Sequence, residues 1–481
     1  MDFSLYSFIF ILISVILFYL VRPKKLRIYV ITLLSFFYVA ELSLRAFVSL
    51  LATMLVTYAV AFLLHRLKKK EKARAARWVY LIGLIAVILS LFIHKYAYWL
   101  MCKMLGIEAL TSTLESIIIP IGLSFYTFQI IDYLSDLYKG RIEFISNPVY
   151  LLCYLSYFPK FISGPLEKAS DFMEQLRSLE DVRLFDNNRL NRAISCLLTG
   201  YFMKIVIADR AAAFVNPVFN DSWAYGSGLI ILSSFIYTLQ IYTDFAGYSL
   251  IAVGVSELFG IRLINNFNSP YLAESITDFW SRWHISLSAW IKEHLYIPLG
   301  GNRKGVKRQY FNLIAVFVIC GIWHGAACKF IFWGLLHGVY SVVAKWAKAK
   351  NINWLIKGWS GRIITFLCVN FAWIFFGNVY FRGALQYLAN IFINLTTTPF
   401  FGGYKLFAEK YTDFFVLVSV TIFLWIWEWI SYKKKMCLAD YITALPQVKR
   451  YILWYILLMA ILILGVYGIS IGNSDFIYMH F

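Results

Sequence analysis

Long apolar runs are the sequence feature that most constrains this chain. A helix that crosses about 30 Å of membrane hydrocarbon needs roughly 20 apolar residues, and a helix satisfies its own backbone hydrogen bonds there. We therefore predict an all-α, polytopic transmembrane helical bundle. The expected spans are residues 3–21, 28–44, 46–65, 78–101, 115–136, 192–208, 227–252, 310–327, 329–347, 361–380, 413–431 and 450–471.

The composition excludes several classes of soluble protein. Of the 481 residues, 60% are hydrophobic and only 15% are charged, whereas soluble chains average about 25% charged residues. These few charged residues are not enough to cover the surface of a water-soluble protein of this size. A soluble enzyme, a disordered chain and a nucleic-acid-binding module are therefore excluded.

Positive charge gathers at the ends of the spans and predicts their orientation. The net charge is +19, and loops rich in Lys and Arg stay in the cytoplasm, where anionic headgroups add about 1 kcal/mol of attraction per residue. We expect a multi-pass protein of the cytoplasmic (inner) membrane with both termini outside, and an uncleaved anchor at residues 1–21. The expected cytoplasmic loops are 22–27, 66–77, 137–191, 303–308, 345–357 and 432–435.

Two stretches fit no plain span. Residues 147–161 are apolar but short and are interrupted by prolines, and residues 278–308 mix tryptophans with charges before a Gly-Gly pair. Irregular backbone at membrane depth survives only where it is buried in protein or lines a cavity. We expect both stretches to be re-entrant or interfacial helices. With no repeat and no long linker, residues 1–481 are expected to form a single membrane-embedded domain.

The cysteines do not indicate a disulfide framework or a zinc site. None of the seven belongs to a CxxC pair, so reduced, buried thiols are the simplest interpretation. Cys320 and Cys328 do flank His324 at i−4 and i+4, which admits a Cys/His nucleophile or a metal site. Because a metal site requires more polar ligand side chains than this segment offers, we expect no bound metal and no prosthetic group.

His324 is the best candidate for chemistry. It lies inside an apolar run, in Gly321-Ile-Trp-His-Gly-Ala, and the small glycines beside it let a ligand or another backbone come close. An imidazole titrates near neutral pH and suits a general base. The alternative is a histidine that packs against a neighbouring helix, and the segment alone does not decide between the two.

His284 is a second candidate, in Asp278-Phe-Trp-Ser-Arg-Trp-His. If the segment is one helix, Asp278 and Arg282 form an i,i+4 ion pair and His284 shares a face with Trp280, Leu287 and Ile291. The alternative is an interfacial helix anchored by its tryptophans. His337, which repeats the His-Gly pairing, is assigned to packing.

A transporter remains an alternative of another class. Asp132, Asp136 and Asp244 lie near spans and are of the type that relays ions. No Gly-rich phosphate loop stands between a strand and a helix, which argues against an ATP-driven pump.

Several motifs of this sequence resemble those of one protein family, and they follow one another in the same order as in that family. The sequence is similar to bacterial membrane-bound O-acyltransferases, in the branch that holds the alginate and peptidoglycan O-acetyltransferases and the D-alanyl-teichoic acid transfer protein. The matches, concentrated in residues 115–340, begin at Pro120 (PIGLSFYTFQ), Phe158 (FPKFISGP), Gln240 (QIYTDFAGYS), Asn265 (NNFNSPY), Asp278 (DFWSRWHISLSAW), His294 (HLYIPLGGNR) and Ile322 (IWHGA), with a further one at Phe476 (FIYMHF).

The resemblance implies a fold, a reaction and two site residues. The family's catalytic histidine falls on His324 and its second recurrent polar position on His284. The helices of the family surround a central tunnel. An acyl group passes from a cytoplasmic thioester, acetyl-CoA or the phosphopantetheine of an acyl carrier protein, to a hydroxyl reached from the other side. The implied enzyme is an O-acyltransferase that binds no cofactor.

Within the family, we expect transfer of acetyl for O-acetylation of a cell-surface or secreted polysaccharide. Because no esterase-like Gly-x-Ser-x-Gly elbow is present, a separate extracytoplasmic acyltransferase or esterase-like protein is the expected partner, besides the lipid bilayer and the donor; no nucleic acid is expected. The alternative is transfer of D-alanine from a carrier protein to teichoic acid.

Replacing His324 by Ala separates the enzyme from the transporter. General-base catalysis contributes about 10²–10⁴-fold, so His324→Ala should abolish acylated product while the protein remains folded in the membrane, and His284→Ala should cause a milder loss. Product is measured by mass spectrometry of envelope glycans. A His324→Ala protein with unchanged product would contradict the assignment.

Overall fold

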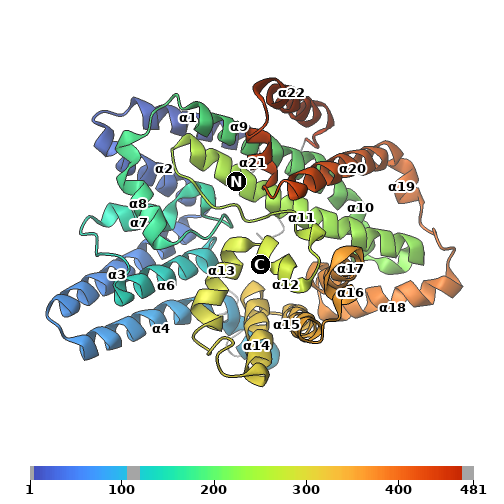
Figure 1. The fold of residues 1–481 in the computed structure, drawn as a ribbon, viewed down its shortest axis with the longest axis horizontal. Coiled ribbons are helices and arrows are strands. Elements are labelled where there is room, and N and C mark those ends of the chain that lie inside the picture. Colours follow the sequence, from blue (N-terminus) through green and yellow to red (C-terminus); the bar gives the residue numbers. More distant parts are fainter. Residues whose placement is uncertain (1–4, 106–119, 468–481) are drawn as a thin grey trace. The chain divides into compact units, whose positions relative to one another are not determined.

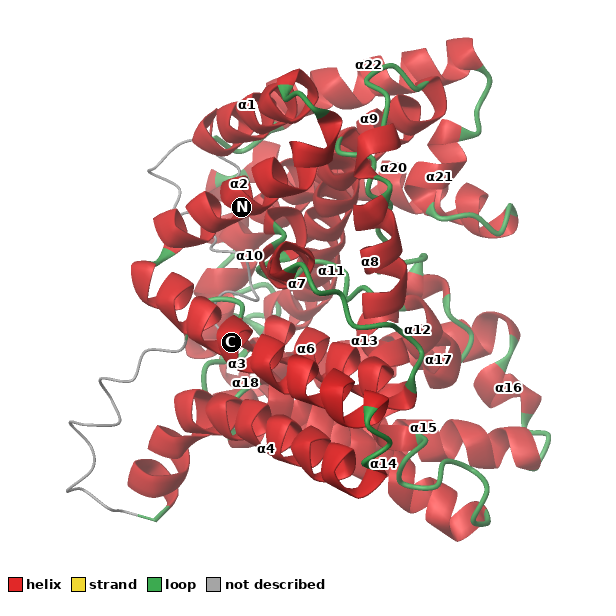
Figure 2. Cartoon of the chain, turned by 90° about the vertical axis from the view of Figure 1, so that its left-hand side faces the viewer, coloured by secondary structure: helices red, strands yellow, loops and turns green. Residues whose placement is uncertain are grey.

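A computed structural model describes residues 5–105 and 120–467, and within these ranges the chain forms helices and turns but no strand. Figure 1 labels the helices along the chain and Figure 2 shows the loops between them. The longer helices are α1 Leu5–Leu20, α2 Arg27–Leu42, α3 Leu44–Lys69, α4 Ala73–Tyr98, α6 Leu123–Lys139, α7 Pro148–Ser156, α8 Ala169–Arg177, α9 Asn187–Tyr201, α10 Asp209–Asn220, α11 Ser227–Leu258, α14 Val306–His324, α15 Cys328–Ala349, α17 Gly358–Gly377, α18 Phe381–Thr397, α20 Tyr411–Lys433 and α22 Gln447–Leu464.

Short helices join these elements. They are α12 Ile276–Arg282, α13 Ile285–Ile291, α16 Asn353–Ile356, α19 Lys405–Glu409 and α21 Leu438–Thr443. Residues 115–119 of an expected span, residues 468–471 of another and the motif that begins at Phe476 lie outside the described residues.

Nine helices in the described residues are long and apolar enough to cross a membrane, which confirms an all-α polytopic protein. Each of the twelve expected spans contains a helix, but α1, α2 and α6 have only 16, 16 and 17 residues. Within the described residues, nine rather than twelve helices are long enough because a helix rises only about 1.5 Å per residue, and these three are too short to cross the hydrocarbon.

Two segments that lie between expected spans contain helices. Residues 209–226 hold α10, which continues from α9 through a π-helical turn, and residues 381–412 hold α18. The buried face of α18 carries two asparagines: Asn390 donates to the Ser222 hydroxyl at 2.8 Å, and Asn394 to the Tyr225 carbonyl at 2.7 Å. A hydropathy pattern misses such a helix because its buried face is partly polar.

The helices form two compact units. The first comprises residues 1–193 and 252–264, and the second comprises residues 194–251 and 265–481. Both expected site residues belong to the second unit. The prediction of a single domain stays a prediction.

In the first unit, the stretch expected to be re-entrant is a short helix followed by a tight turn. Helix α7 is capped by Asn147, whose side chain accepts the Val149 amide, and ends before a 3₁₀ turn at Phe158–Lys160. The Lys160 ammonium is buried against the rings of Tyr154 and Phe172, at 4.3 and 4.1 Å from their centroids. This cation–π packing holds the irregular backbone inside protein.

In the second unit, α14 and α15 form a hairpin whose helices touch at glycines. Figure 1 shows the two helices side by side. A Cβ at Gly321 would lie 2.1 Å from the Phe330 carbonyl oxygen, and one at Gly334 would lie 2.3 Å from the Phe317 carbonyl oxygen. Only glycine permits this approach, and the approach fixes the turn that carries His324.

A larger residue at Gly334 is expected to force the hairpin apart. Overpacking costs roughly 1–3 kcal/mol, so Gly334→Val should lower the temperature at which detergent-solubilised protein loses its monodisperse peak. The control is Gly383→Val on α18, where a Cβ would meet only the Asn378 side-chain oxygen at 3.4 Å. Equal losses for both variants would show that close helix contact is not what the glycine provides.

Candidate functional site

His284 lies at a break between two short helices rather than within one. Its backbone is left-handed, with φ 44°, between α12 and α13. Asn266 builds this break: its carbonyl accepts the Ile285 amide at 3.0 Å, and its side-chain oxygen accepts the amide and hydroxyl of Ser286 at 3.1 and 2.6 Å. The expected continuous helical face from Trp280 to Ile291 is therefore wrong, although the Asp278–Arg282 ion pair is present at 2.8 Å.

The imidazole of His284 is buried and unpaired. The residue is 1% exposed, and neither ring nitrogen has a hydrogen-bond partner among the described residues. The ring meets Phe245 edge-on, with centroids 4.8 Å apart. Burial lowers the pKa of His284 from 6.5 to about 3, so the ring is neutral. A buried polar group without a partner costs about 1–3 kcal/mol, which makes this position a candidate for contact with a ligand.

A small cavity with several polar residues in its lining lies beside Asn266. It has a volume of about 20 Å³, and its lining includes Asn266, Ser269 and Tyr242. The Asn266 side-chain nitrogen, like the imidazole of His284, has no partner in the part of the chain that the structure describes. A volume of this size holds about one water molecule or one polar ligand group.

His324 ends α14, at the turn into α15. It is 4% exposed, and its ring packs edge-on against Trp333 and Phe376, with centroids 5.1 and 5.2 Å away. Gly325 follows in extended backbone and starts the turn. The rings of Trp333 and Phe376 fix the orientation of the imidazole.

His337, which the sequence analysis assigns to packing, lies among aromatic rings. It is fully buried, and its Nδ1 lies 3.3 Å from the Trp280 Nε1–H, which donates to it. Its ring contacts Trp333, with centroids 4.8 Å apart. Trp333 therefore touches both His324 and His337.

Two of the histidines, His324 and His337, contact one group of rings, here named the aromatic cluster: Trp280, Trp283, Trp333, Trp373 and Phe376. Trp373 links its two sides, because its ring lies 5.1 Å from Trp283 and 5.8 Å from Trp333. His324 and His337 contact the cluster directly, and His284 follows Trp283 in the chain. The structure thus brings all three histidines into one region of the second unit.

Sequence reasoning missed Trp333, Trp373 and Lys329. The Trp333 indole N–H is buried beside His324 and finds no acceptor in residues 5–105 and 120–467. Lys329 is buried at the start of α15 and donates to the carbonyls of Phe376 and Asn378 at 3.2 and 2.5 Å, which ties α17 to the His324 turn. The sequence did contain a signal for Lys329, because it stands at the start of an apolar run and a charge in such a place is retained only where it has partners.

The carboxylates considered for ion relay are occupied by other groups. Asp244 pairs with Lys204 at 2.6 Å, Asp136 pairs with Arg141 at 3.1 Å, and Asp132 accepts the Ala169 amide at 2.8 Å. Cys320 and Cys328 are free thiols. Among the described residues, no group of three or more His, Cys, Asp and Glu side chains is arranged to hold a metal ion.

Comparison with known proteins identifies the region that contains both histidines. A family model described as "MBOAT, membrane-bound O-acyltransferase family" matches residues 138–381, which is half of the chain. This range includes His284, His324 and the whole aromatic cluster.

Individual relatives carry related names. A peptidoglycan O-acetyltransferase of Helicobacter pylori is 34% identical over 386 residues, covering 74% of this chain and 72% of the relative. A probable alginate O-acetylase AlgI of Pseudomonas aeruginosa is 34% identical over 323 residues, covering 63% of this chain and 58% of the relative. A teichoic acid D-alanyltransferase of Bacillus subtilis is 27% identical, covering 65% of this chain and 80% of the relative. The chain thus spans somewhat more than half the length of the alginate relatives that it matches.

The buried imidazole of His284 predicts a specific loss of stability in acid. Since its pKa is 6.5 in the unfolded chain and about 3 in the folded one, the unfolded state binds the extra proton between these values. The free energy of unfolding should fall as the pH drops below 6.5, by up to about 1.4 kcal/mol per pH unit from this group. His284→Asn, which tolerates left-handed backbone, should reduce that slope.

The slope is measured from thermal unfolding of the purified protein at several pH values between 7 and 4. His65→Asn is the control, because it makes the same substitution at an exposed histidine on α3. An identical slope for wild type and His284→Asn would mean that the folded protein binds a proton at this ring.

Proposed function

The chain belongs to the membrane-bound O-acyltransferase family, and from this premise we propose that it transfers an acyl group from a cytoplasmic thioester to a hydroxyl. The proposed acyl group is acetyl, and the reaction serves the O-acetylation of a cell-surface or secreted polysaccharide. The observation that carries the proposal is the buried His324 ring, which lies within the matched region and packs between the rings of Trp333 and Phe376. The protein is a multi-pass membrane protein, and we place it in the cytoplasmic (inner) membrane.

His324 acts as the general base in this proposal. One imidazole nitrogen takes the proton of the acceptor hydroxyl while the hydroxyl oxygen attacks the thioester carbonyl. The carbon–sulfur bond then breaks, and the leaving thiolate takes the proton from the imidazolium, which gives a free thiol and restores the neutral base. The rings of Trp333 and Phe376 hold the imidazole and exclude water, which limits hydrolysis of the thioester.

Trp333 supplies a hydrogen bond to the developing oxyanion. Its N–H is buried, belongs to a ring 5.1 Å from that of His324 and lacks an acceptor among the described residues. A donor left unpaired before the reaction pays no reorganisation cost when negative charge develops near it. His284 provides a second unpaired position in the same region and contacts the substrate in this proposal.

Acetyl is favoured over D-alanyl by the relatives. The O-acetyltransferase relatives are 34% identical to this chain, whereas the D-alanyltransferase relatives are 27% identical. Donor and acceptor are both substrates, so the proposal needs no bound cofactor. A separate extracytoplasmic acyltransferase or esterase-like protein would complete transfer to the polymer, and an acyl carrier protein is the donor in the D-alanyl alternative.

Release of free thiol tests the reaction directly. Purified protein reconstituted in vesicles should release CoA from acetyl-CoA in the presence of an acceptor polysaccharide, and should form an acetyl ester that mass spectrometry detects. Release from a D-alanyl-carrier thioester but not from acetyl-CoA would favour the alternative. The absence of thiol release from every acyl donor and acceptor tried would overturn the proposal.

Trp333→Phe tests the oxyanion donor separately from the fold. The substitution keeps an aromatic ring in the cluster but removes the N–H, and loss of one such donor lowers kcat by about 10²–10³-fold. KM for the donor should change little. The matched control is Trp427→Phe, which removes another buried, unpaired indole N–H, on α20. Equal kcat for wild type and Trp333→Phe would exclude this role.

A further inference from the structure

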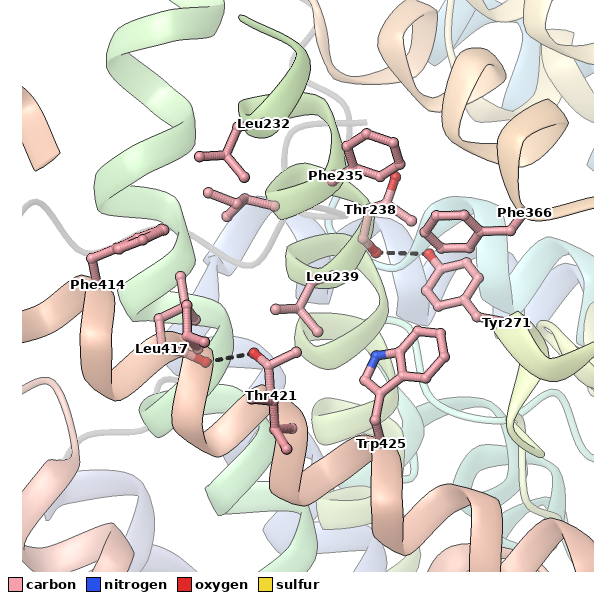
Figure 3. Close-up of a pocket in the computed structure, with 13 residues that line it drawn as sticks. Leu232, Phe235, Thr238, Leu239, Tyr271, Phe366, Phe414, Leu417, Thr421 and Trp425 are labelled. Atoms are coloured by element: carbon pink, nitrogen blue, oxygen red, sulfur yellow. Dashed lines mark hydrogen bonds between the residues drawn. The ribbon is translucent and has the colours of Figure 1, made fainter. Parts of the chain in front are cut away.

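An apolar groove lies between α11, α17 and α20 in the second unit. Its volume is about 270 Å³, compared with about 150 Å³ for an engineered apolar cavity that holds benzene. Figure 3 shows Leu232, Phe235 and Leu239 on one helix facing the residues of α20, with Phe366 and Tyr271 beside them. From α20 the groove is lined by Phe414, Leu417, Val418, Thr421, Ile422 and Trp425.

The lining of the groove suits an apolar ligand. The hydroxyls that border it are already used, since Tyr271 donates to the Thr238 carbonyl at 2.7 Å and Thr421 donates to the Leu417 carbonyl at 2.6 Å. All three lining helices are long enough to cross a membrane. Ile422 and Trp425 are 55% and 41% exposed, so within a bilayer this side of the groove meets lipid chains.

One end of the groove leads to a group of aromatic and basic side chains, here named the basic aromatic cluster: Trp359, Arg362, Trp429, Tyr432 and Lys433. Trp359 stacks on Trp429 with centroids 5.3 Å apart, and the Lys433 ammonium lies 5.2 Å from the Trp429 ring. Tryptophans paired with basic residues are typical of the membrane–water interface.

The groove and the basic aromatic cluster are consecutive on both helices. On α17, Arg362 precedes the groove residue Phe366 by one turn. On α20, Trp429 and Lys433 follow the groove residue Trp425 by one and two turns. One turn is about 5.4 Å, so a polar headgroup at the basic aromatic cluster lies directly beyond a chain in the groove.

The charge of this end favours an anion. Arg362 is already paired with Glu274 at 2.6 Å and bonded to the Tyr432 hydroxyl at 3.2 Å, but Lys433 is exposed and is followed by Lys434 and Lys435. The sequence predicts loop 432–435 to be cytoplasmic, where the leaflet carries anionic lipid.

We propose that this groove is a binding site for an anionic phospholipid of the cytoplasmic leaflet. One acyl chain lies between α11, α17 and α20, and the phosphate lies against Lys433 and the indole N–H groups of the basic aromatic cluster. The site is independent of the acyl transfer proposed for His324.

Native mass spectrometry tests the site with two lipid probes. Purified full-length protein is titrated with phosphatidylglycerol and with phosphatidylcholine of the same acyl chains. We expect tighter binding of phosphatidylglycerol. Lys433→Gln should weaken that binding about fivefold, while Lys449→Gln, an exposed lysine at the start of α22, should not.

Occlusion of the groove gives the second test. Ile422→Trp fills it, whereas Ile426→Trp changes a residue of similar exposure on the same helix, 58% against 55%, that does not line it. Bound phosphatidylglycerol should fall severalfold in Ile422→Trp alone. Unchanged binding in Ile422→Trp, or equal binding of the two lipids by wild type, would overturn the proposal, as would cross-linking that places a second copy of the chain in the groove.

Discussion

Hydrocarbon cannot solvate a backbone N–H or C=O group, and this constraint shapes the whole chain. It explains why the described residues form helices, and why an interruption that is buried needs partners for its backbone. The break before α13 exists because Asn266 accepts the amides of Ile285 and Ser286. The end of α17 is held because Lys329 donates to two carbonyls there. Buried polar side chains act here as substitutes for water.

The same constraint makes unpaired polar groups informative. Partners are provided for the backbone at the His284 break, yet the imidazole of His284, the side-chain nitrogen of Asn266 and the indole of Trp333 lack them among the described residues. Such groups carry a desolvation cost. All three belong to the unit that contains His324.

Aromatic rings separate two kinds of surface in the second unit. Trp333 of the aromatic cluster packs against His324 and His337 in the buried interior, whereas the rings of Phe366 and Trp425 border a groove beside exposed residues of α20. Tyr271 joins the two regions, because it lines the groove and its hydroxyl accepts the Trp373 N–H at 3.2 Å. Rings serve both roles because their faces are apolar while an indole or phenol edge still forms hydrogen bonds.

Hydropathy and motif order determined the fold class, the family and the two candidate histidines, since twenty-residue apolar runs and the IWHGA and DFWSRWH segments are local properties of the chain. They did not reveal α18, whose buried face carries asparagines, or the left-handed break at His284, which depends on Asn266, 18 positions earlier. Only the tertiary structure decided that Trp333 and Trp373 gather the histidines, because packing brings together rings from helices that share no sequence pattern. Local propensity depends on residues that are neighbours in the sequence. A site in a membrane protein depends on contacts between distant residues, which take the place of the hydrogen bonds that water would otherwise form.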